Sequence, residues 1–292
     1  MHKAVLIGSN GQLGTEISRI WSSRPNLRGT ELVCLTHADL DITDRQRVDT
    51  VLGEAAPDAV INTAGFLRVD ECEKVPETAV NVNAIGTQHV ADYCRKNAAL
   101  LVHLSTDYVF DGCKHEPYCE NDNAAPVNAY GLSKLMGECF VRYLLPDTHL
   151  IVRTSGLFGP AGSTNKGGNF IETMLRLAGT GKSLRVVDDQ IFSPTYSPDL
   201  AEVLLDLVEA DARGVFHVTN AGNTSWYEFA RSSFDLAGMD ADLTPATTAE
   251  YASPARRPAY SVLDNALAER YCSTKMPAWQ DGLERYMLAR KP

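Results

Sequence analysis

The sequence predicts an α/β protein built on a Rossmann-type, doubly wound parallel sheet, with a smaller C-terminal α/β region. Over residues 1–155, short and almost wholly apolar runs alternate with amphipathic segments. This alternation is typical of parallel strands that helices cover on both faces. A glycine-rich turn follows the first apolar run, and residues 156–168 contain five glycines and a proline. We therefore place the end of the first domain at residue 155.

The elements can be placed from hydrophobic periodicity. The apolar runs that we interpret as strands of the first domain are residues 3–7, 31–35, 59–62, 100–104 and 149–153. Helical patterns cover 44–55, a segment that begins near Pro76, and 130–145; later helices are expected at 169–177, 198–210, 225–234 and 277–288, and later strands at 184–187 and 214–218. We expect residues 195–213 to pack back onto the first domain, and residues 156–194 and 214–292 to form the second region.

The composition excludes several classes of protein. The chain has 292 residues, of which 44% are hydrophobic and 22% charged, as in ordinary globular domains. No apolar run approaches the ~20 residues of a membrane-spanning helix, and Met1-His2-Lys3 leads directly into a strand, so we expect neither a membrane segment nor a signal peptide. The net charge of −10 argues against a nucleic-acid surface. Seven cysteines without a Cys-x-x-Cys pair predict reduced thiols in a cytoplasmic protein, and no metal site is expected.

A glycine-rich turn joins the first strand to the first helix. Its residues are Gly8-Ser9-Asn10-Gly11-Gln12-Leu13-Gly14. Glycines allow a tight turn that brings the backbone close to a pyrophosphate, and the free N–H groups of the following helix attract the same anion. Such turns also occur as plain connections, but a strand before this one and a helix after it favour a dinucleotide site.

Two further strand ends bear on the cofactor. An acidic residue after the second strand would bond the adenosine ribose and repel a 2′-phosphate, whereas this chain has Thr36-His37 and its first acid at Asp39. The difference favours NADP(H) over NAD(H), although a solvated loop explains the same residues nearly as well. After the third strand, Thr63-Ala64-Gly65 offers small side chains that let a ligand lie close to the backbone.

A candidate proton-transfer group lies in the middle of the chain. Thr106 ends the fourth strand, and Tyr130 and Lys134 stand about one helical turn apart on a shared helix face. An ammonium beside a phenol favours phenolate and lowers the phenol's pKa from ~10 toward the range of general acid–base catalysis. Each residue alone has a plain structural explanation, but the strand end, the helix start and the glycine turn all point to one cleft.

Taken in order, these motifs resemble those of the extended short-chain dehydrogenase/reductase superfamily, and within it the dTDP-4-dehydrorhamnose reductase family. The matching stretches are residues 8–14, 62–73, 105–110, 130–138, 153–155, 169–175, 189–195 and 257–261. The resemblance implies the same fold and a reductase of a nucleotide-linked 4-keto sugar. Its product would be dTDP-L-rhamnose, and the second region would bind the substrate.

The resemblance also implies a role for each site residue. Tyr130 would be the general acid that protonates the carbonyl oxygen, Lys134 would bind the nicotinamide ribose and lower the Tyr130 pKa, and Thr106 would bond the carbonyl oxygen. The cofactor, NADP(H) with NAD(H) as the alternative, would be held by Gly8, Asn10, Gly11, Gln12, Leu13, His37, Asp41, Ile42, Ala64, Gly65, Tyr130 and Lys134. The nucleotide sugar would contact Asp107, Tyr108, Asn169 and Arg257.

Three residues depart from that family's pattern, all on the substrate side. Gly156 stands where the family usually has tryptophan, Phe66-Leu67 where it usually has a polar or aromatic residue followed by threonine, and Tyr260 where it often has asparagine. A larger or less polar substituent on the sugar would suit Gly156 and Phe66. The exact sugar therefore stays open.

Two alternatives also stay open. One is a nucleotide-sugar epimerase or dehydratase, although dehydratases carry glutamate where Tyr108 follows Asp107 in this chain. The other is a non-catalytic NADP-binding regulatory subunit that resembles the β subunit of methionine adenosyltransferase. The sequence leaves a homodimer open as well.

Overall fold

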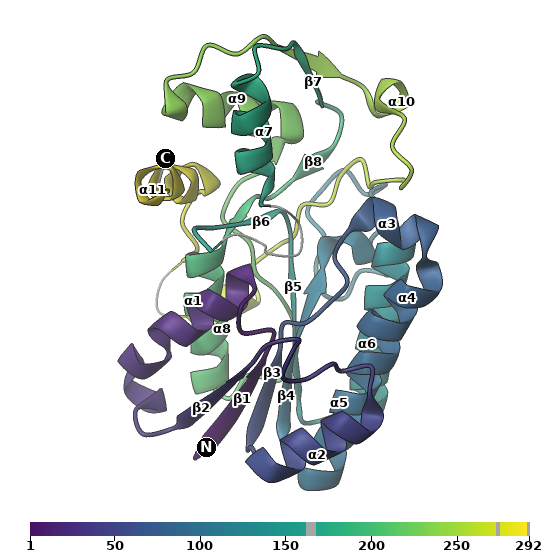
Figure 1. Ribbon diagram of the computed structural model, residues 1–292, viewed down its shortest axis with the longest axis vertical. Helices are drawn as coiled ribbons and strands as arrows, with labels where there is room; N and C mark the ends of the chain where they lie inside the picture. Colours follow the sequence, from purple (N-terminus) through teal and green to yellow (C-terminus); the bar gives the residue numbers. More distant parts are fainter. Residues whose placement is uncertain (162–167, 273–274, 291–292) are drawn as a thin grey trace.

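A parallel sheet forms the lower part of the molecule (Figure 1). A computed structural model describes residues 1–161, 168–272 and 275–290, so part of the glycine-rich segment 156–168 lies outside the described residues. In sheet order, the strands are β2 (Glu31–Leu35), β1 (Lys3–Ile7), β3 (Ala59–Asn62), β4 (Leu100–Thr106), β5 (His149–Thr154) and β10 (Gly214–His217). Every neighbouring pair is parallel. The predicted fold class is confirmed.

Helices cover both faces of this sheet (Figure 1). On one face lie α1 (Gln12–Ile20) and α8 (Ser197–Glu209), and on the other lie α2 (Arg45–Ala55), α4 (Pro76–Val80), α5 (Thr87–Asn97) and α6 (Ala129–Leu144). Short helical pieces connect them: η1 (Trp21–Ser23), η2 (Pro25–Leu27), α3 (Val69–Lys74), the π-helical η3 (Asn81–Gly86) and η4 (Asp107–Val109). The layers follow from near-continuous apolar strands, which have to be buried on both faces.

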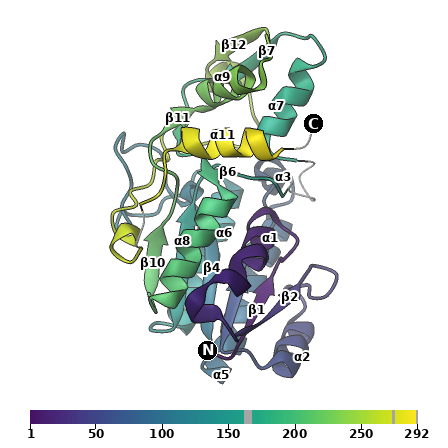
Figure 2. The ribbon, with the colours of Figure 1, turned by 90° about the vertical axis from the view of Figure 1, so that its left-hand side faces the viewer.

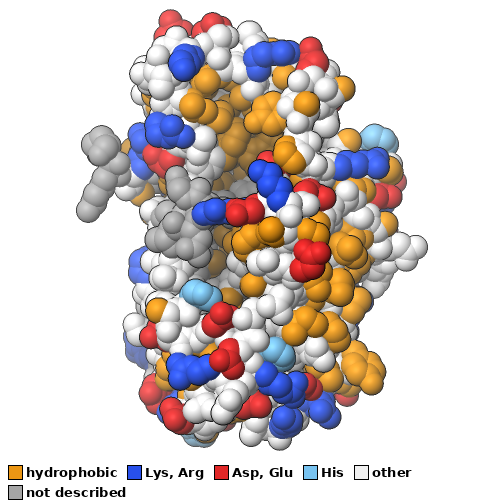
Figure 3. Space-filling view, turned by 45° about the vertical axis from the view of Figure 1, so that its right-hand side comes forward, with side chains coloured by type: hydrophobic (Ala, Val, Ile, Leu, Met, Phe, Trp, Pro, Cys, Tyr) orange, Lys and Arg blue, Asp and Glu red, His pale blue; other side chains and the backbone are white. Residues whose placement is uncertain are grey.

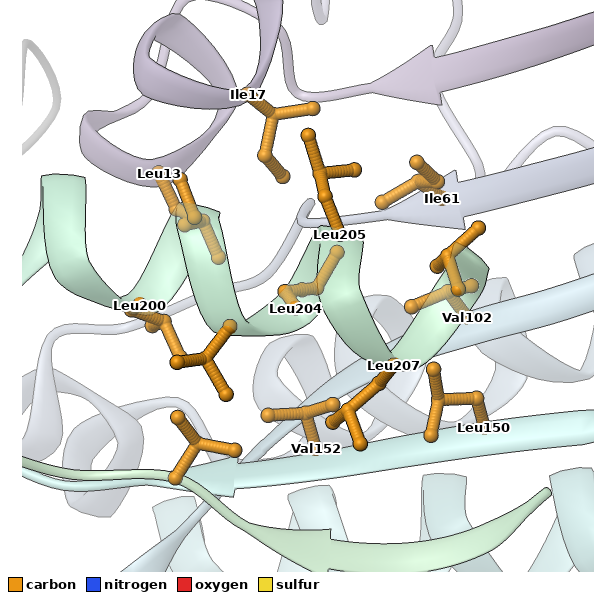
Figure 4. Packing of buried hydrophobic residues seen from close by; sticks show 14 of the residues in the cluster. Leu13, Ile17, Ile61, Val102, Leu150, Val152, Leu200, Leu204, Leu205 and Leu207 are labelled. Carbon is orange, nitrogen blue, oxygen red and sulfur yellow. The ribbon is translucent and has the colours of Figure 1, made fainter. Parts of the chain in front are cut away.

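Alternate residues of each strand supply the two cores. In β4, Val102 faces the α1 and α8 side, whereas Leu101 faces the α5 and α6 side. Figure 4 shows the first of these cores, where leucines of α8 and the α1 residues Leu13 and Ile17 pack over side chains of β3, β4 and β5. Full burial of one such side chain stabilises a fold by about 1.5–3 kcal/mol. This packing holds the carboxyl ends of the strands in fixed register.

A smaller lobe sits above the sheet (Figure 1). Its elements are β6 (Leu157–Phe158), α7 (Phe170–Ala178), β7 (Leu184–Val187), β8 (Ile191–Phe192), β9 (Thr195–Tyr196), β11 (Thr224–Ser225), α9 (Trp226–Ala237), β12 (Leu243–Ala246), α10 (Thr248–Tyr251) and α11 (Trp279–Ala289). The short helix η5 (Ala268–Arg270) packs instead on the core of the sheet domain. Phe229 centres its aromatic core, with ring centroids 5.4 Å from Phe158 and 5.7 Å from Trp279. Helix α11 crosses between the lobe and the sheet domain (Figure 2).

One predicted boundary differs from the structure. Residues 214–217, placed with the second region, form β10 and pair with β5 as an outer strand of the central sheet. Periodicity identified the strand but could not show which sheet it joins. Helix α8 packs against α1, as expected for residues 195–213. Within the described ranges, no helix is both long and apolar enough to span a bilayer.

Candidate active site

The carboxyl ends of β1 and β3 define a crevice. The chain leaves β1 toward β2 on one side and later returns to β3 on the other side of β1. Doubly wound sheets bind ligands at such a switch point. The glycine turn follows β1 there, Ala64 and Gly65 follow β3, and Thr63 Oγ1 donates to the Ile7 carbonyl (2.8 Å) to tie the two strand ends together. The structure thus gathers the predicted pyrophosphate and groove residues at one edge.

The glycine turn has the geometry that a bound anion needs. Gly8 lies at φ +80°, where a side chain would be strained, and an added Cβ would stand 2.7 Å from Thr63 Oγ1. Gly11 caps α1 without any side-chain hydrogen bond, so the N–H groups of the first turn stay available. The buried Gln12 Nε2 lacks a hydrogen-bond partner among the described residues. These residues fit a dinucleotide pyrophosphate.

Replacing Gly14 by alanine is expected to weaken NADPH binding and destabilise the fold. The added Cβ would stand 2.3 Å from the Gly8 carbonyl oxygen and 2.8 Å from Ser9 Cα, so the turn would have to move. Overpacking of this kind costs about 1–3 kcal/mol. Urea unfolding and fluorescence titration with NADPH measure the two effects.

Gly53 provides a matched control for that substitution. It lies within α2, and an added Cβ would meet nothing within 4 Å. Gly53→Ala should therefore stabilise the protein by about 0.5–1 kcal/mol and leave NADPH affinity unchanged. Equal affinity losses in the two variants would contradict a role for the close approach at Gly14.

The end of β2 carries no acid that is free to bond a ribose. The Asp39 carboxylate accepts from the backbone N–H of Thr36 (2.8 Å) and from its hydroxyl (2.7 Å), which closes the turn. His37 is exposed beside it. Arg47 Nη2 donates to the Asp39 carbonyl (3.0 Å), which places at this turn a guanidinium that sequence reasoning missed. Its only signal in the sequence was an arginine in the first turn of the following helix.

The two residues predicted near adenine occupy the next turn. The Asp41 carboxylate accepts from the Thr43 N–H (2.9 Å) and hydroxyl (2.8 Å). The Ile42 side chain is buried against η3, where an added Cβ on Gly86 would stand 2.6 Å from it. Both residues therefore shape the wall beside the switch point.

Helix α6 begins close to the end of β4. Asn128 caps it by accepting from the Gly131 N–H (2.7 Å), and an added Cβ on Gly131 would stand 2.0 Å from the Tyr108 carbonyl oxygen. The start of α6 therefore lies close to the Tyr108 backbone. The Tyr130 ring stands edge-on to the Tyr108 ring, with centroids 5.9 Å apart. The Thr106 hydroxyl is close enough to the Tyr130 phenol to lower the pKa of that phenol. The predicted carbonyl-binding hydroxyl and the predicted acid are therefore adjacent.

Lys134 lies one turn further along α6 and is buried. Its Nζ donates to the Leu104 carbonyl of β4 (2.5 Å). Burial lowers the pKa of Lys134 to about 8, and the nearby Glu138 carboxylate opposes that shift. Thr106, Tyr130 and Lys134 thus gather around the carboxyl end of a single strand.

The expected effect of Lys134 on Tyr130 differs from what the structure contains. Burial raises the pKa of Tyr130 above its ordinary value, the nearby Thr106 hydroxyl lowers it, and the Asp107 charge raises it. Loss of water around the phenolate raises the pKa of Tyr130 by more than the Thr106 hydroxyl lowers it. Tyr130 therefore keeps its proton at neutral pH, which is the state that a general acid needs.

Asp107 lies beneath the site rather than in it. Its side chain is buried, with Oδ1 accepting from Thr106 Oγ1 (3.0 Å) and Oδ2 from Ser155 Oγ (2.8 Å). The Ser261 hydroxyl bonds the same carboxylate. Both carboxylate oxygens of Asp107, which was expected to contact substrate, therefore already accept hydrogen bonds from the protein. Sequence reasoning could not see them because the hydroxyls of Ser155 and Ser261 come from distant segments.

Tyr108 and Arg257 meet beside Tyr130. The half-buried Arg257 hydrogen-bonds the Tyr108 phenol. Arg257 Nη2 also donates to Asp70 Oδ1 (3.0 Å), and the same oxygen accepts from Ser253 Oγ (2.8 Å). The structure therefore brings both predicted sugar-nucleotide residues to the site and adds Asp70 as their anionic partner. Arg257 and Asp70 are 187 residues apart in the chain, so their pairing was not predictable from the sequence.

Asn169, predicted to contact the sugar-nucleotide, lies at the start of α7. Its Oδ1 caps α7 by accepting from the Glu172 N–H (3.0 Å), and its Nδ2 donates to the Tyr286 hydroxyl (3.0 Å) and the Gly159 carbonyl (3.4 Å). Both ends of the amide are thus used inside the smaller lobe. An asparagine before a helical pattern is a common cap, and this plain interpretation accounts for it.

The smaller lobe presents an apolar wall to the interlobe face. Figure 3 shows this face hollowed in its upper half, with hydrophobic side chains in the hollow. Gly156 lies at φ +53°, and an added Cβ would stand 2.3 Å from Phe192, whose ring stacks on Trp226 at 3.9 Å. Phe192 therefore fills the space above Gly156. The glycine does not by itself make room for a larger sugar substituent, contrary to the expectation.

With this geometry established, comparison with known proteins identifies the family. The family model described as the RmlD substrate binding domain matches residues 2–291. The chain belongs to this family. The resemblance to dTDP-4-dehydrorhamnose reductases is thereby confirmed, and the chain is an oxidoreductase.

Several known proteins match this RmlD family member over nearly its full length. The Bacillus subtilis (strain 168) spore coat polysaccharide biosynthesis protein SpsK is 40% identical, over 99% of this chain and 98% of its own. A dTDP-4-keto-6-deoxy-D-glucose reductase of Streptomyces niveus is 39% identical, over 96% and 94%. The solved dTDP-4-dehydrorhamnose reductase of Bacillus anthracis in complex with NADP is 38% identical, with a TM-score of 0.90 and coverage of 98% and 99%.

Proposed function

We propose that this protein is an NADPH-dependent reductase that converts dTDP-4-dehydrorhamnose to dTDP-L-rhamnose. The observation that carries the proposal is the placing of the Thr106 and Tyr130 hydroxyls together at the carboxyl end of β4, with Lys134 Nζ bonded to the same strand. Two hydroxyls at one point bind and protonate a carbonyl oxygen, and the dinucleotide crevice lies along the same sheet edge. Carbonyl reduction uses this arrangement directly.

Each of the three residues has a defined part in this reaction. Tyr130 holds a proton at its phenol oxygen and passes it to the carbonyl oxygen as negative charge develops there. Thr106 orients that oxygen through its hydroxyl. Lys134 contributes a buried cation that stabilises the tyrosinate left behind, an effect that grows where water is excluded.

The cofactor site fits NADPH in two places. Residues Gly8, Asn10, Gly11, Gln12 and Leu13 would hold the pyrophosphate through backbone N–H groups. His37 and Arg47 would face the adenosine ribose, where a 2′-phosphate would meet an imidazole, a guanidinium and no free carboxylate. When bound, the nicotinamide supplies the hydride. The NADP held by the Bacillus anthracis relative supports this choice.

The sugar-nucleotide would lie against Tyr108 and Arg257, where the guanidinium suits a diphosphate. The Streptomyces niveus relative supports a second candidate substrate, dTDP-4-keto-6-deoxy-D-glucose. The two substrates differ in ring configuration and share the carbonyl at C4. The apolar pair Phe192 and Trp226 would limit polar contacts to either sugar. A homodimer stays a prediction.

Purified protein should oxidise NADPH when dTDP-4-dehydro-6-deoxy-L-mannose is added, which is followed by loss of absorbance at the reduced nicotinamide band. NADPH should outperform NADH because of His37 and Arg47, and nuclear magnetic resonance of the product should show dTDP-L-rhamnose. A strong NADH preference would contradict the ribose argument.

The same assay separates the remaining alternatives. Faster turnover of dTDP-4-keto-6-deoxy-D-glucose would favour the second substrate. Sugar interconversion without net NADPH loss would indicate an epimerase. Retained NADPH binding without turnover of either keto sugar would overturn the reductase and favour a regulatory subunit.

A further inference from the structure

A single buried carboxylate gathers hydroxyl groups from three segments around the site. Asp107 follows β4 and is 3% exposed. It accepts from Thr106 at the end of β4, from Ser155 just after β5, and from Ser261 in the loop beyond α10. A buried carboxylate needs such donors because losing water destabilises its charge. One of these donors, Thr106, also faces the reacting oxygen in the proposed mechanism.

The Thr106 hydroxyl has only one proton to give. That proton is donated to Asp107 Oδ1 (3.0 Å), and the oxygen accepts from the Tyr108 N–H (3.2 Å), with the Tyr130 phenol close by. While its proton points to Asp107 Oδ1, Thr106 can only accept from the Tyr130 phenol. It cannot then donate to a substrate oxygen. The direction of this one O–H bond decides whether the carbonyl oxygen receives one donor or two.

We propose that Asp107 is a positioning residue that sets the direction of the Thr106 hydroxyl. Ionised Asp107 holds the Thr106 proton, whereas the protonated carboxyl donates to Thr106 Oγ1 and turns the Thr106 proton toward the substrate carbonyl. No covalent bond other than O–H changes in this step, and the proton on Asp107 comes from solvent. The inference rests on the proposed reductase function for its kinetic part.

The surroundings of Asp107 allow this change near neutral pH. Burial raises the pKa of Asp107 to about 6, and the bonds from Ser261, Ser155 and Thr106 act against that rise. The titratable groups that face it are the phenols of Tyr108 and Tyr130, whose pKa values burial raises. Arg257 lies behind Tyr108 and donates to Asp70. Lys134 has a pKa of about 8, so its titration falls above that of Asp107.

The first test is the pH profile of kcat for the wild type and Asp107→Asn with saturating NADPH and keto sugar. The wild type should gain roughly tenfold or more in kcat as the pH falls through about 6, because a second donor reaches the carbonyl oxygen. In the variant, the carboxamide N–H donates to Thr106 at every pH. Its profile should be flat across this range, with kcat at pH 7.5 no lower than that of the wild type.

Ser155→Ala tests whether a general packing defect, and not the direction of the Thr106 hydroxyl, explains the effect of Asp107→Asn. Removing this donor disfavours ionised Asp107, so the midpoint of the wild-type profile should move to higher pH while the shape is kept. A purely structural role would lower activity equally at every pH. The proposal is overturned if Asp107→Asn keeps the wild-type midpoint, or if Ser155→Ala leaves that midpoint in place.

A measurement without substrate keeps this proposal separate from the reductase assignment. The folded pKa of Asp107, about 6, lies above the ordinary value of 3.8, so the native state binds the proton more tightly. Stability relative to Asp107→Asn should therefore fall as the pH rises from about 4 to 6. If stability shows this pH dependence but no keto sugar is turned over, the reductase proposal fails. If turnover occurs without this pH dependence, the Asp107 proposal fails.

Discussion

Tyr130→Phe should lower kcat for keto-sugar reduction by about 10²- to 10⁴-fold, the usual contribution of a positioned general acid. The substitution removes the phenolic oxygen beside the Thr106 hydroxyl and leaves the ring edge-on to Tyr108. The glycine turn and the ribose end of the crevice lie on other strands, so the affinity for NADPH should stay within a few-fold. Initial rates and a fluorescence titration with NADPH measure both quantities on the same sample.

Tyr143→Phe is the matched control for this substitution. Tyr143 lies on the same helix, is 82% exposed, and should tolerate loss of its hydroxyl with no change in rate. Activity of Tyr130→Phe within tenfold of the wild type would refute the assignment of Tyr130 as the acid. A loss of NADPH affinity as large as the loss in kcat would instead indicate that the site had been distorted.

The parts of this site that depend on neighbouring residues were predictable from the sequence. The strand before Gly8 and the helix after it fix the glycine turn within a dozen residues, and the four-residue spacing of Tyr130 and Lys134 fixes their shared face. The carboxyl ends of parallel strands necessarily meet at one edge of the sheet. Thr106 and Ala64 therefore had to lie near the glycine turn once the strands were recognised.

The remaining features depend on burial and on partners that are far away in the chain. The sign of the Tyr130 pKa shift follows from how much water the folded chain removes, which spacing along a helix does not show. Asp107 looked like a substrate contact because hydroxyls from distant loops satisfy it. The place of β10 in the sheet was hidden in the same way, since an isolated strand pattern carries no information about its neighbour.

A buried ion pair joins the layers directly behind this site. Arg153 of β5 donates through Nε and Nη2 to both oxygens of Glu138 of α6, at 2.8 and 2.7 Å. The two side chains are 3% and 0% exposed. Ser105 Oγ donates to the same carboxylate (2.5 Å), and Arg153 Nη1 lies 3.3 Å from His217 Nε2 on β10. The pair therefore connects three strands to the helix that carries Tyr130 and Lys134.

His217 makes the stability that this network contributes dependent on pH. Its Nδ1 bonds the Tyr118 carbonyl (2.9 Å), so the neutral ring presents Nε2 as the acceptor for Arg153. Burial and the Arg153 charge lower the pKa of His217 from 6.5 to about 3. The unfolded chain therefore binds this proton first as the pH falls. The contribution of neutral His217 is complete above pH 6.5 and is lost progressively toward pH 3.

Glu138→Gln is expected to destabilise the protein by about 3–5 kcal/mol, because it leaves the Arg153 guanidinium buried without a counter-charge. Urea unfolding at pH 7.5 measures the loss, and Glu31→Gln provides the control. Glu31 pairs with Lys3 on the surface at 61% exposure, where such a pair contributes about 0–1 kcal/mol.

The double variant Glu138→Gln/Arg153→Met distinguishes an unpaired charge from lost packing. If the unpaired guanidinium causes the loss, removing it as well should restore part of the stability, since apolar replacement of both partners is often tolerated. Additive losses from the two substitutions would show that packing dominates. Because Glu138 also opposes the fall in the Lys134 pKa, the single variant should lower that pKa further. Its remaining activity should therefore decline at a lower pH than that of the wild type, which ties the stability of this pair to the charge state of Lys134.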